Sequence, residues 1–183
     1  EAVASTGAEA PLVETSAAPV TFTASAALPG LSGPVTLADV DRDGDLDIVG
    51  NGGILFNEGT TFRAALTAVV PSAAGPRGPA AFGAAIAGDY DNDERVDLFA
   101  PGAAAPALFH QKADGTFENV ATAAGIPAAK GAPGAMALVD ADHDGDLDIL
   151  LGAGAGGTNV LLRNNGNGTF TDVSAASGLA AIA

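Results

Sequence analysis

The stretch "DADHDGDLDIL", residues 140–150, places five aspartates within nine positions and continues directly into apolar residues. The pattern occurs twice more, as "DVDRDGDLDIV" from Asp39 and as "DYDNDERVDLF" from Asp89. Two carboxylates about 4 Å apart repel each other by roughly 4 kcal/mol at an effective dielectric constant of about 20. Such crowding predicts that a bound cation neutralises each stretch.

The spacing of these acids is typical of a calcium loop. Carboxylates at positions 1, 3, 5 and 9 can converge on one point, glycine at position 6 allows a sharp turn, and position 7 can offer its backbone carbonyl. Calcium prefers several hard oxygen ligands in a flexible loop, whereas magnesium keeps its waters. An EF-hand would need glutamate at position 12 and flanking helices. Position 12 is Gly50, Ala100 or Leu151 here, so we expect a strand-loop-strand site instead.

The second copy departs from this pattern because Glu94 replaces the glycine at position 6. A non-glycine residue at positive φ costs on the order of 1 kcal/mol. Its four carboxylates at positions 1, 3, 5 and 9 remain. We therefore expect two strong calcium sites and a weaker one in the second loop. The alternative interpretation is that these Asp-Gly segments are solvated turns without a metal. Three copies with the same spacing disfavour that interpretation.

The chain is a repeat with a period of about 50 residues, since the acidic stretches begin 50 (89 − 39) and 51 (140 − 89) positions apart. Periods of this length indicate propellers or solenoids. Each unit has four short apolar runs bounded by Gly, Asn, Asp or Pro, which predicts strands. In the third unit the runs are "GAMALVD" (134–140), "LDILLG" (147–152), "TNVLLRN" (158–164) and "GTFTDVS" (168–174). The turns "ADGTF" (113–117) and "GNGTF" (166–170) are typical of tight hairpins.

These features predict an all-β protein with three repeats, each a four-stranded antiparallel blade of the β-propeller type, in a partial or assembled array. We expect residues 1–19 to be a flexible arm or linker, because they are rich in Ala, Ser, Thr and Pro without periodicity. Residues 20–183 form the repeat domain, with repeats at approximately 32–70, 81–126 and 132–180. Val20–Ala24 is predicted to be an additional strand without a unit of its own.

Composition limits the classes of function. The net charge is −15, with fifteen of the twenty-two acids in the three acidic stretches, which argues against nucleic acid as a partner. Cysteine is absent, which excludes thiol catalysis, disulfides and sulfur-ligated metals. No uninterrupted apolar run reaches the length of about 18 residues that a membrane span needs.

"FGAAIAGDYDNDERVDLFAPG" (82–102) resembles an FG-GAP repeat, as found in integrin-alpha-like blades. "NNGNGTFTDVSAASGL" (164–179) is similar to the VCBS-type repeats of cartilage-acidic-protein and ASPIC/UnbV-like secreted proteins. The resemblance implies propeller blades with a calcium loop between their first and second strands, and a role in adhesion, recognition or scaffolding. Position 7 would contribute only its carbonyl. The implied ligands are Asp39, Asp41, Asp43, Asp45, Asp47, Asp89, Asp91, Asp93, Arg95, Asp97, Asp140, Asp142, Asp144, Asp146 and Asp148.

We expect a secreted or cell-surface, calcium-dependent, non-enzymatic protein that serves assembly or recognition. Three blades do not close a ring, so its partners would be copies of itself, further blades of a longer chain, or an extracellular protein or glycan. The alternative is a propeller domain of a larger secreted enzyme or a sugar-binding lectin. Asn167 begins a glycosylation sequon, although its hairpin position explains the same residues. His110 has no Ser-plus-Asp arrangement near it, and His143 is expected to point outward from its loop.

Overall fold

The computed structural model describes residues 31–51, 53–65, 85–100, 106–127, 134–154 and 157–181. Within these ranges the chain is all-β, apart from the single-turn 3-10 helix η1 (Leu179–Ala181). The predicted arm, residues 1–19, and the predicted strand Val20–Ala24 lie outside the described residues. None of the described helical structure is long and apolar enough to cross a membrane.

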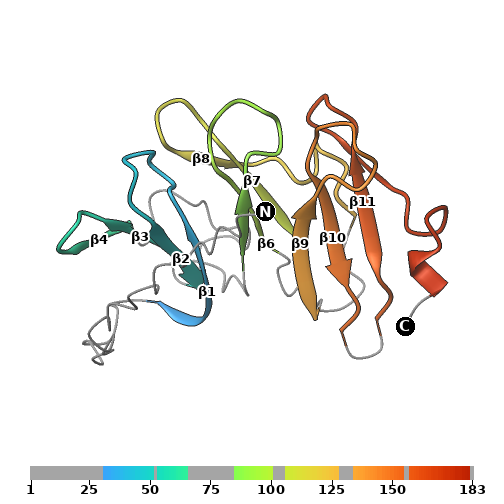
Figure 1. Cartoon of the computed structure of the whole chain (residues 1–183), viewed down its shortest axis with the longest axis horizontal. Coiled ribbons are helices and arrows are strands. Elements are labelled where there is room, and N and C mark those ends of the chain that lie inside the picture. Colours follow the sequence, from blue (N-terminus) through green and yellow to red (C-terminus); the bar gives the residue numbers. More distant parts are fainter. Residues whose placement is uncertain are drawn as a thin grey trace, which may run out of the picture.

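The described strands form three separate four-stranded antiparallel sheets, which we call blades 1 to 3 (Figure 1). Each sheet is a simple meander in which strands adjacent in sequence are adjacent in space, as predicted. Blade 1 contains β1 (Ser32–Ala38), β2 (Asp47–Asn51), β3 (Gly53–Asn57) and β4 (Phe62–Ala65). Blade 2 contains β5 (Ile86–Gly88), β6 (Asp97–Ala100), β7 (Ala107–Gln111) and β8 (Phe117–Asn119). Blade 3 contains β9 (Ala135–Val139), β10 (Asp148–Gly152), β11 (Val160–Asn164) and β12 (Phe170–Asp172).

The predicted turns join the third and fourth strands of blades 2 and 3. Gly115 and Gly168 both have a φ of 77°, a conformation that glycine adopts without steric cost. The polar residue before each glycine accepts a bond from the residue after it, since Thr116 N donates to Asp114 and Thr169 N to Asn167. These Asx-type turns fix the register of each hairpin.

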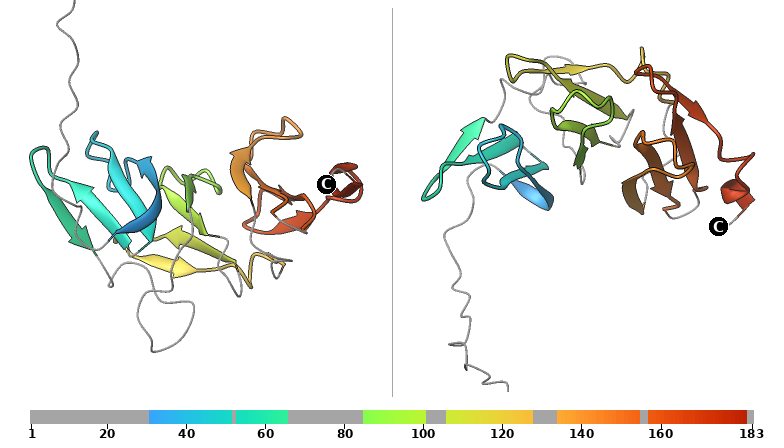
Figure 2. Two further views of the ribbon diagram at one scale, coloured as in Figure 1. Left: turned by 90° about the horizontal axis from the view of Figure 1, so that it is seen from below. Right: turned by 45° about the horizontal axis from the view of Figure 1, so that its top comes forward.

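The blades stand side by side in an open, curved row (Figure 2). Their first strands contact each other, β1 with β5 and β5 with β9. The fourth strands lie on the outer side of the row, as Figure 2 shows. This is the arrangement of propeller blades around a central axis, without closure of a ring by the described residues.

The hydrophobic core lies between blades rather than within one sheet. One cluster joins blade 1 to blade 2, and a second joins blade 2 to blade 3. Successive residues of β6 face opposite neighbours, because Leu98 and Ala100 pack toward blade 1 and Phe99 packs toward blade 3. Burial on both faces explains why the β6 residues are all buried. A blade is therefore stabilised mainly by its neighbours.

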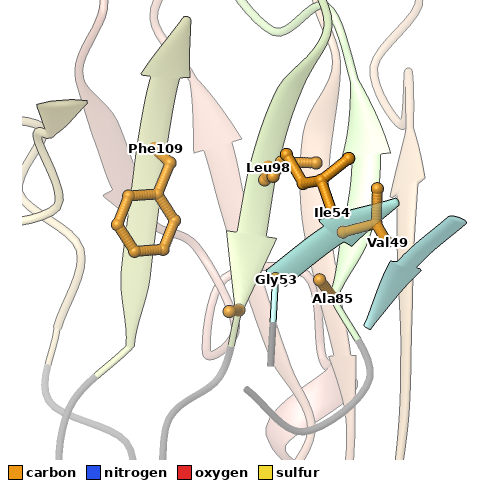
Figure 3. A pocket seen from close by; sticks show the side chains of 7 residues that line it. Val49, Gly53, Ile54, Ala85, Leu98 and Phe109 are labelled. Carbon is orange, nitrogen blue, oxygen red and sulfur yellow. The ribbon is translucent and has the colours of Figure 1, made fainter. Parts of the chain in front are cut away.

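A small apolar pocket opens between blades 1 and 2 (Figure 3). Val49, Gly53 and Ile54 line it from blade 1, and Ala85, Leu98, Ala100 and Phe109 line it from blade 2. Since these side chains carry no polar group, the pocket offers nothing that would orient a ligand. We assign it to imperfect packing between the two blades.

Candidate metal loops

Each acidic stretch forms a loop between the first and second strands of its blade, in the place that the sequence predicts. The loop is folded by its own carboxylates. The aspartate at position 1 accepts bonds from the N–H groups of positions 5 and 6, at 2.8–3.2 Å. The aspartate at position 5 accepts a bond from the N–H of position 7, at 2.9 Å in all three loops. The backbone thus wraps around the first and third acids of the pattern.

This wrapping brings the carboxylates of positions 1, 3 and 5 together. In each loop, one oxygen from each of these three aspartates lies within 4.8 Å of the others. The three groups are Asp39 with Asp41 and Asp43, Asp89 with Asp91 and Asp93, and Asp140 with Asp142 and Asp144. Three converging carboxylates can offer the oxygen ligands that calcium prefers.

Positive φ angles occur at two positions of every loop. At position 6, Gly44 and Gly145 have a φ of 94°, and Glu94 is held at 68° in the second loop. The structure therefore has the turn that the sequence predicts at this position. Position 4 is also left-handed, at Arg42, Asn92 and His143, which sequence reasoning did not anticipate. His143 is exposed, as expected.

The aspartate at position 9 is set apart from the other acids by its burial. Asp47, Asp97 and Asp148 are 0%, 1% and 1% exposed. Both oxygens of each carboxylate accept backbone N–H bonds, one from position 2 of the loop and one from the end of the third strand. The donors are Val40 and Asn57, Tyr90 and Gln111, and Ala141 and Asn164, at 2.8–3.3 Å.

Position 9 therefore ties the loop to the third strand of its own blade. The groups formed by positions 1, 3 and 5 do not include this carboxylate, although Asp97 lies within 4.8 Å of Asp91 in a separate group. A carboxylate oxygen has two lone pairs, so these bonds leave acceptor capacity for a cation. Metal binding by Asp47, Asp97 and Asp148 stays a prediction. The structure shows a second role for these residues, which is to hold the loop to the third strand.

Position 7 lies at the rim of each loop. Asp45 is exposed, and the side chain of Asp146 accepts a bond from Asn92 Nδ2 of the preceding blade at 2.7 Å. Arg95 occupies this position in blade 2, where its guanidinium pairs with Asp93. Its Nε also donates to Gln111 O at 2.7 Å. The side chains of Arg95 and Asp146 thus make contacts of their own, as expected if only the carbonyl serves a metal.

Burial and neighbouring acids disfavour the charged form of several loop carboxylates. Burial raises the pKa of Asp41, and the charges of Asp47 and Asp43 raise it further. Burial, followed by the charge of Asp93, raises the pKa of Asp91. Burial raises the pKa of Asp97 to about 7, although the N–H of Gln111 opposes the shift. A bound cation would reverse this effect, because it stabilises the ionised carboxylates.

His110 joins the second loop, a contact that the sequence did not reveal. Its Nδ1 lies 3.2 Å from Asp91 Oδ2 and 3.4 Å from Asp97 Oδ1. The three residues form a further group whose ligand atoms lie within 4.8 Å of one another. His110 is the last but one residue of β7, thirteen residues after Asp97, and only strand pairing places it over the loop. No sequence signal would have identified this contact.

The comparison with known families agrees with the repeat assignment. A family model described as the FG-GAP-like repeat matches residues 89–151, which span the second acidic loop to the second strand of blade 3. This match supports the FG-GAP family for that segment. No curated protein matches the chain.

Proposed function

We propose that the chain is a calcium-binding blade module, in which metal ions in the three loops fix the edges of blades that assemble with further blades. The observation that carries this proposal is the convergence of three carboxylates in every loop. The raised pKa values of Asp41 and Asp91 support it, because burial and neighbouring carboxylates disfavour their ionised forms, which a bound cation would stabilise. The FG-GAP-like match supports the class of repeat.

Calcium titration and chelation test the metal proposal. We expect calorimetry to detect at least two bound calcium ions, with a weaker third site in the loop that contains Glu94. A site at a calcium concentration of 100 times its Kd contributes about 2.7 kcal/mol to stability. The melting temperature should therefore fall when chelator is added.

A pair of variants assigns the binding to a loop. Asp142→Asn removes the central carboxylate of the third loop and should remove one calcium equivalent. Glu118→Gln, an exposed acid in β8 outside the loops, should leave the stoichiometry unchanged. A melting curve that stays unchanged after exhaustive chelation would contradict the metal proposal.

The assembly part of the proposal is supported by where apolar side chains are exposed. Among the described residues, the exposed large hydrophobic side chains are Val35, Leu37, Leu46, Phe62 and Val139. Val35, Leu37, Leu46 and Phe62 belong to blade 1. We give the name open flank to the surface formed by three of these residues, Leu37, Leu46 and Phe62, together with Asn57.

The residues equivalent to this open flank are covered in the other blades. Phe62 is 40% exposed, whereas its counterparts Phe117 and Phe170 are 2% and 6% exposed. Phe117 packs in the cluster that joins blades 1 and 2, and Phe170 in the cluster that joins blades 2 and 3. Val96, the counterpart of Leu46, packs against the first of these clusters. The open flank is thus the face that a preceding blade covers.

A repeated hydrogen bond supports the same geometry. The amide side chain that ends the third strand donates to the carbonyl at position 2 of the preceding blade. Gln111 Nε2 bonds Val40 O at 2.9 Å, and Asn164 Nδ2 bonds Tyr90 O at 2.7 Å. Asn57 is the equivalent residue of blade 1, where its amide donates to Leu46 O of its own blade at 3.3 Å.

We propose that a second copy of this chain binds to the open flank. Its blade 3 would supply the carbonyl of Ala141 to Asn57, in a head-to-tail contact that gives a ring or a filament. A secreted or cell-surface setting and a non-enzymatic role belong to the same proposal. The alternative, a propeller domain of a larger secreted enzyme or lectin, would keep the calcium loops and place the active or sugar-binding site elsewhere.

A further inference from the structure

We propose that blade 2 carries a site for a divalent transition metal such as Zn²⁺, formed by Asp91, Asp97 and His110. This site differs in chemistry from the all-oxygen loops, because it includes an imidazole nitrogen. Calcium takes oxygen ligands, whereas zinc, copper and nickel accept imidazole readily. The site shares Asp91 with the second calcium group, so calcium and a transition metal would compete for that carboxylate.

The distances between the ligand atoms already suit a small metal ion. His110 Nδ1 lies 3.2 Å from Asp91 Oδ2 and 3.4 Å from Asp97 Oδ1. Zinc binds nitrogen and carboxylate oxygen at about 2.0–2.2 Å, so two ligands of a tetrahedral site lie about 3.3–3.6 Å apart. The three ligand atoms all lie within 4.8 Å of one another, and water could serve as the fourth ligand.

Two polar atoms at this place lack partners. Asp91 Oδ1 and His110 Nδ1 are buried without a hydrogen bond to any part of the chain that the structure describes. A buried polar atom without a partner costs about 1–3 kcal/mol. A metal ion would satisfy His110 Nδ1, and it would satisfy Asp91 Oδ1 as well if it bound both oxygens of that carboxylate.

The surrounding contacts hold the ligands in place. Asp97 is fixed by the backbone N–H groups of Tyr90 and Gln111. The ring of Tyr90 meets the His110 ring edge-on, with their centroids 6.3 Å apart. Such outer contacts orient metal ligands in proteins. The charges also balance, since two carboxylates and a neutral imidazole cancel a divalent cation.

The site is specific to blade 2. The residues that occupy the His110 position in the other blades are Phe56 and Arg163, neither of which binds metals. Arg95 is also specific to this blade, and its guanidinium is engaged with Asp93. Because Arg95 neutralises one carboxylate of the second calcium group and the proposed ion uses another, the second loop is the least suited to calcium.

Cobalt absorption spectroscopy tests the proposal, with Co²⁺ as a coloured substitute for Zn²⁺. The full chain is titrated at a calcium concentration that fills the first and third loops, because calcium in the second loop would compete for Asp91. We expect one Co²⁺ equivalent with visible d–d bands, displaced by Zn²⁺. His110→Gln should weaken Co²⁺ binding at least about tenfold, since even losing an outer contact costs 10–100-fold in affinity. Its calcium stoichiometry at the first and third loops should stay unchanged.

The only other histidine of the chain provides the matched control. His143→Gln alters an exposed residue of the third loop and should retain the Co²⁺ spectrum. As a measurement that needs no variant, Zn²⁺ should shift the imidazole ¹⁵N resonances of one histidine in the unmodified protein. The proposal is overturned if His110→Gln keeps the wild-type Co²⁺ affinity, or if neither histidine resonance responds to Zn²⁺.

Discussion

Glu94 has a backbone conformation for which the other two loops have glycine at the same position. Its φ is 68°, in the left-handed region, while Gly44 and Gly145 occupy the same position at 94°. The N–H of Glu94 donates to Asp89 at 2.8 Å, and its carbonyl accepts from Arg42 of blade 1 at 3.1 Å. These bonds on both sides of the residue hold it there in spite of the steric cost.

Glu94→Gly should therefore stabilise the protein. The expected gain in the free energy of unfolding is about 1 kcal/mol, because glycine adopts positive φ without a Cβ clash. Urea denaturation in the presence of chelator measures this gain without a contribution from calcium. The same variant should tighten calcium binding in the second loop.

Two control variants separate backbone strain from charge. Glu94→Gln removes the charge but keeps the strain, so it should gain less than Glu94→Gly. Gly145→Ala should lose a similar amount of stability, because an added Cβ meets no atom within 4 Å and only the φ of 94° opposes it. Equal stability of Glu94→Gly and Glu94→Gln would show that strain at this position is negligible.

In each blade, one buried carboxylate accepts hydrogen bonds from the backbone at the end of the third strand and in the acidic loop. Asp47, Asp97 and Asp148 each begin the second strand, and each accepts one N–H from the loop and one from the end of the third strand. The carboxylate thus joins three segments whose backbone donors would otherwise be buried without partners. This role in joining the loop to the strands does not need a bound metal.

Asp47→Asn should destabilise the protein in calcium and in chelator alike. The asparagine side chain has only one oxygen, so its amide nitrogen would face the N–H of Val40 or Asn57. An unsatisfied buried N–H costs about 1–3 kcal/mol, which urea denaturation measures.

Asp45→Asn is the matched control, since it makes the same chemical change two residues earlier at an exposed position. It should change the free energy of unfolding by less than about 0.5 kcal/mol. If Asp47→Asn lost stability only in calcium, position 9 would act as a metal ligand and not as a backbone clamp.

The open flank of blade 1 is the surface that we propose a second copy of the chain covers. Leu37, Leu46 and Phe62 are exposed there, whereas neighbouring blades cover the equivalent positions. Large apolar patches on a soluble protein usually mark an interaction surface. In a head-to-tail contact, blade 3 of one copy would cover the open flank of the next copy, in the same way as blade 1 covers blade 2 and blade 2 covers blade 3.

Phe62→Ser should weaken self-association. We expect light scattering to show a mass above that of one 17.6 kDa chain for the unmodified protein, and a shift toward monomer for the variant. Glu118→Ser, at an exposed site of the corresponding strand in blade 2, should leave the mass unchanged. A compact monomer at micromolar concentration for all three proteins would rule out the assembly.

The blades and the positions of the acidic loops could be predicted from the amino-acid sequence. Short apolar runs between turn residues predicted the strands, and the repeat of about 50 residues predicted three equivalent sheets, all of which the structure has. The glycine at position 6 predicted the left-handed turn. These features are local, because strand pairing within a meander and turn conformation depend on residues close together in the chain.

Which residues face which blade, and which groups meet at the second loop, could be seen only in the folded molecule. Strands buried on both faces lack the alternation of polar and apolar residues that would identify an inner face, so Phe99 and Leu98 could not be assigned to different neighbours. The burial of Asp97 and its contact with His110 arise from pairing β6 with β7. The physical reason is that burial and side-chain proximity depend on neighbouring strands and blades, which a repeat pattern does not specify.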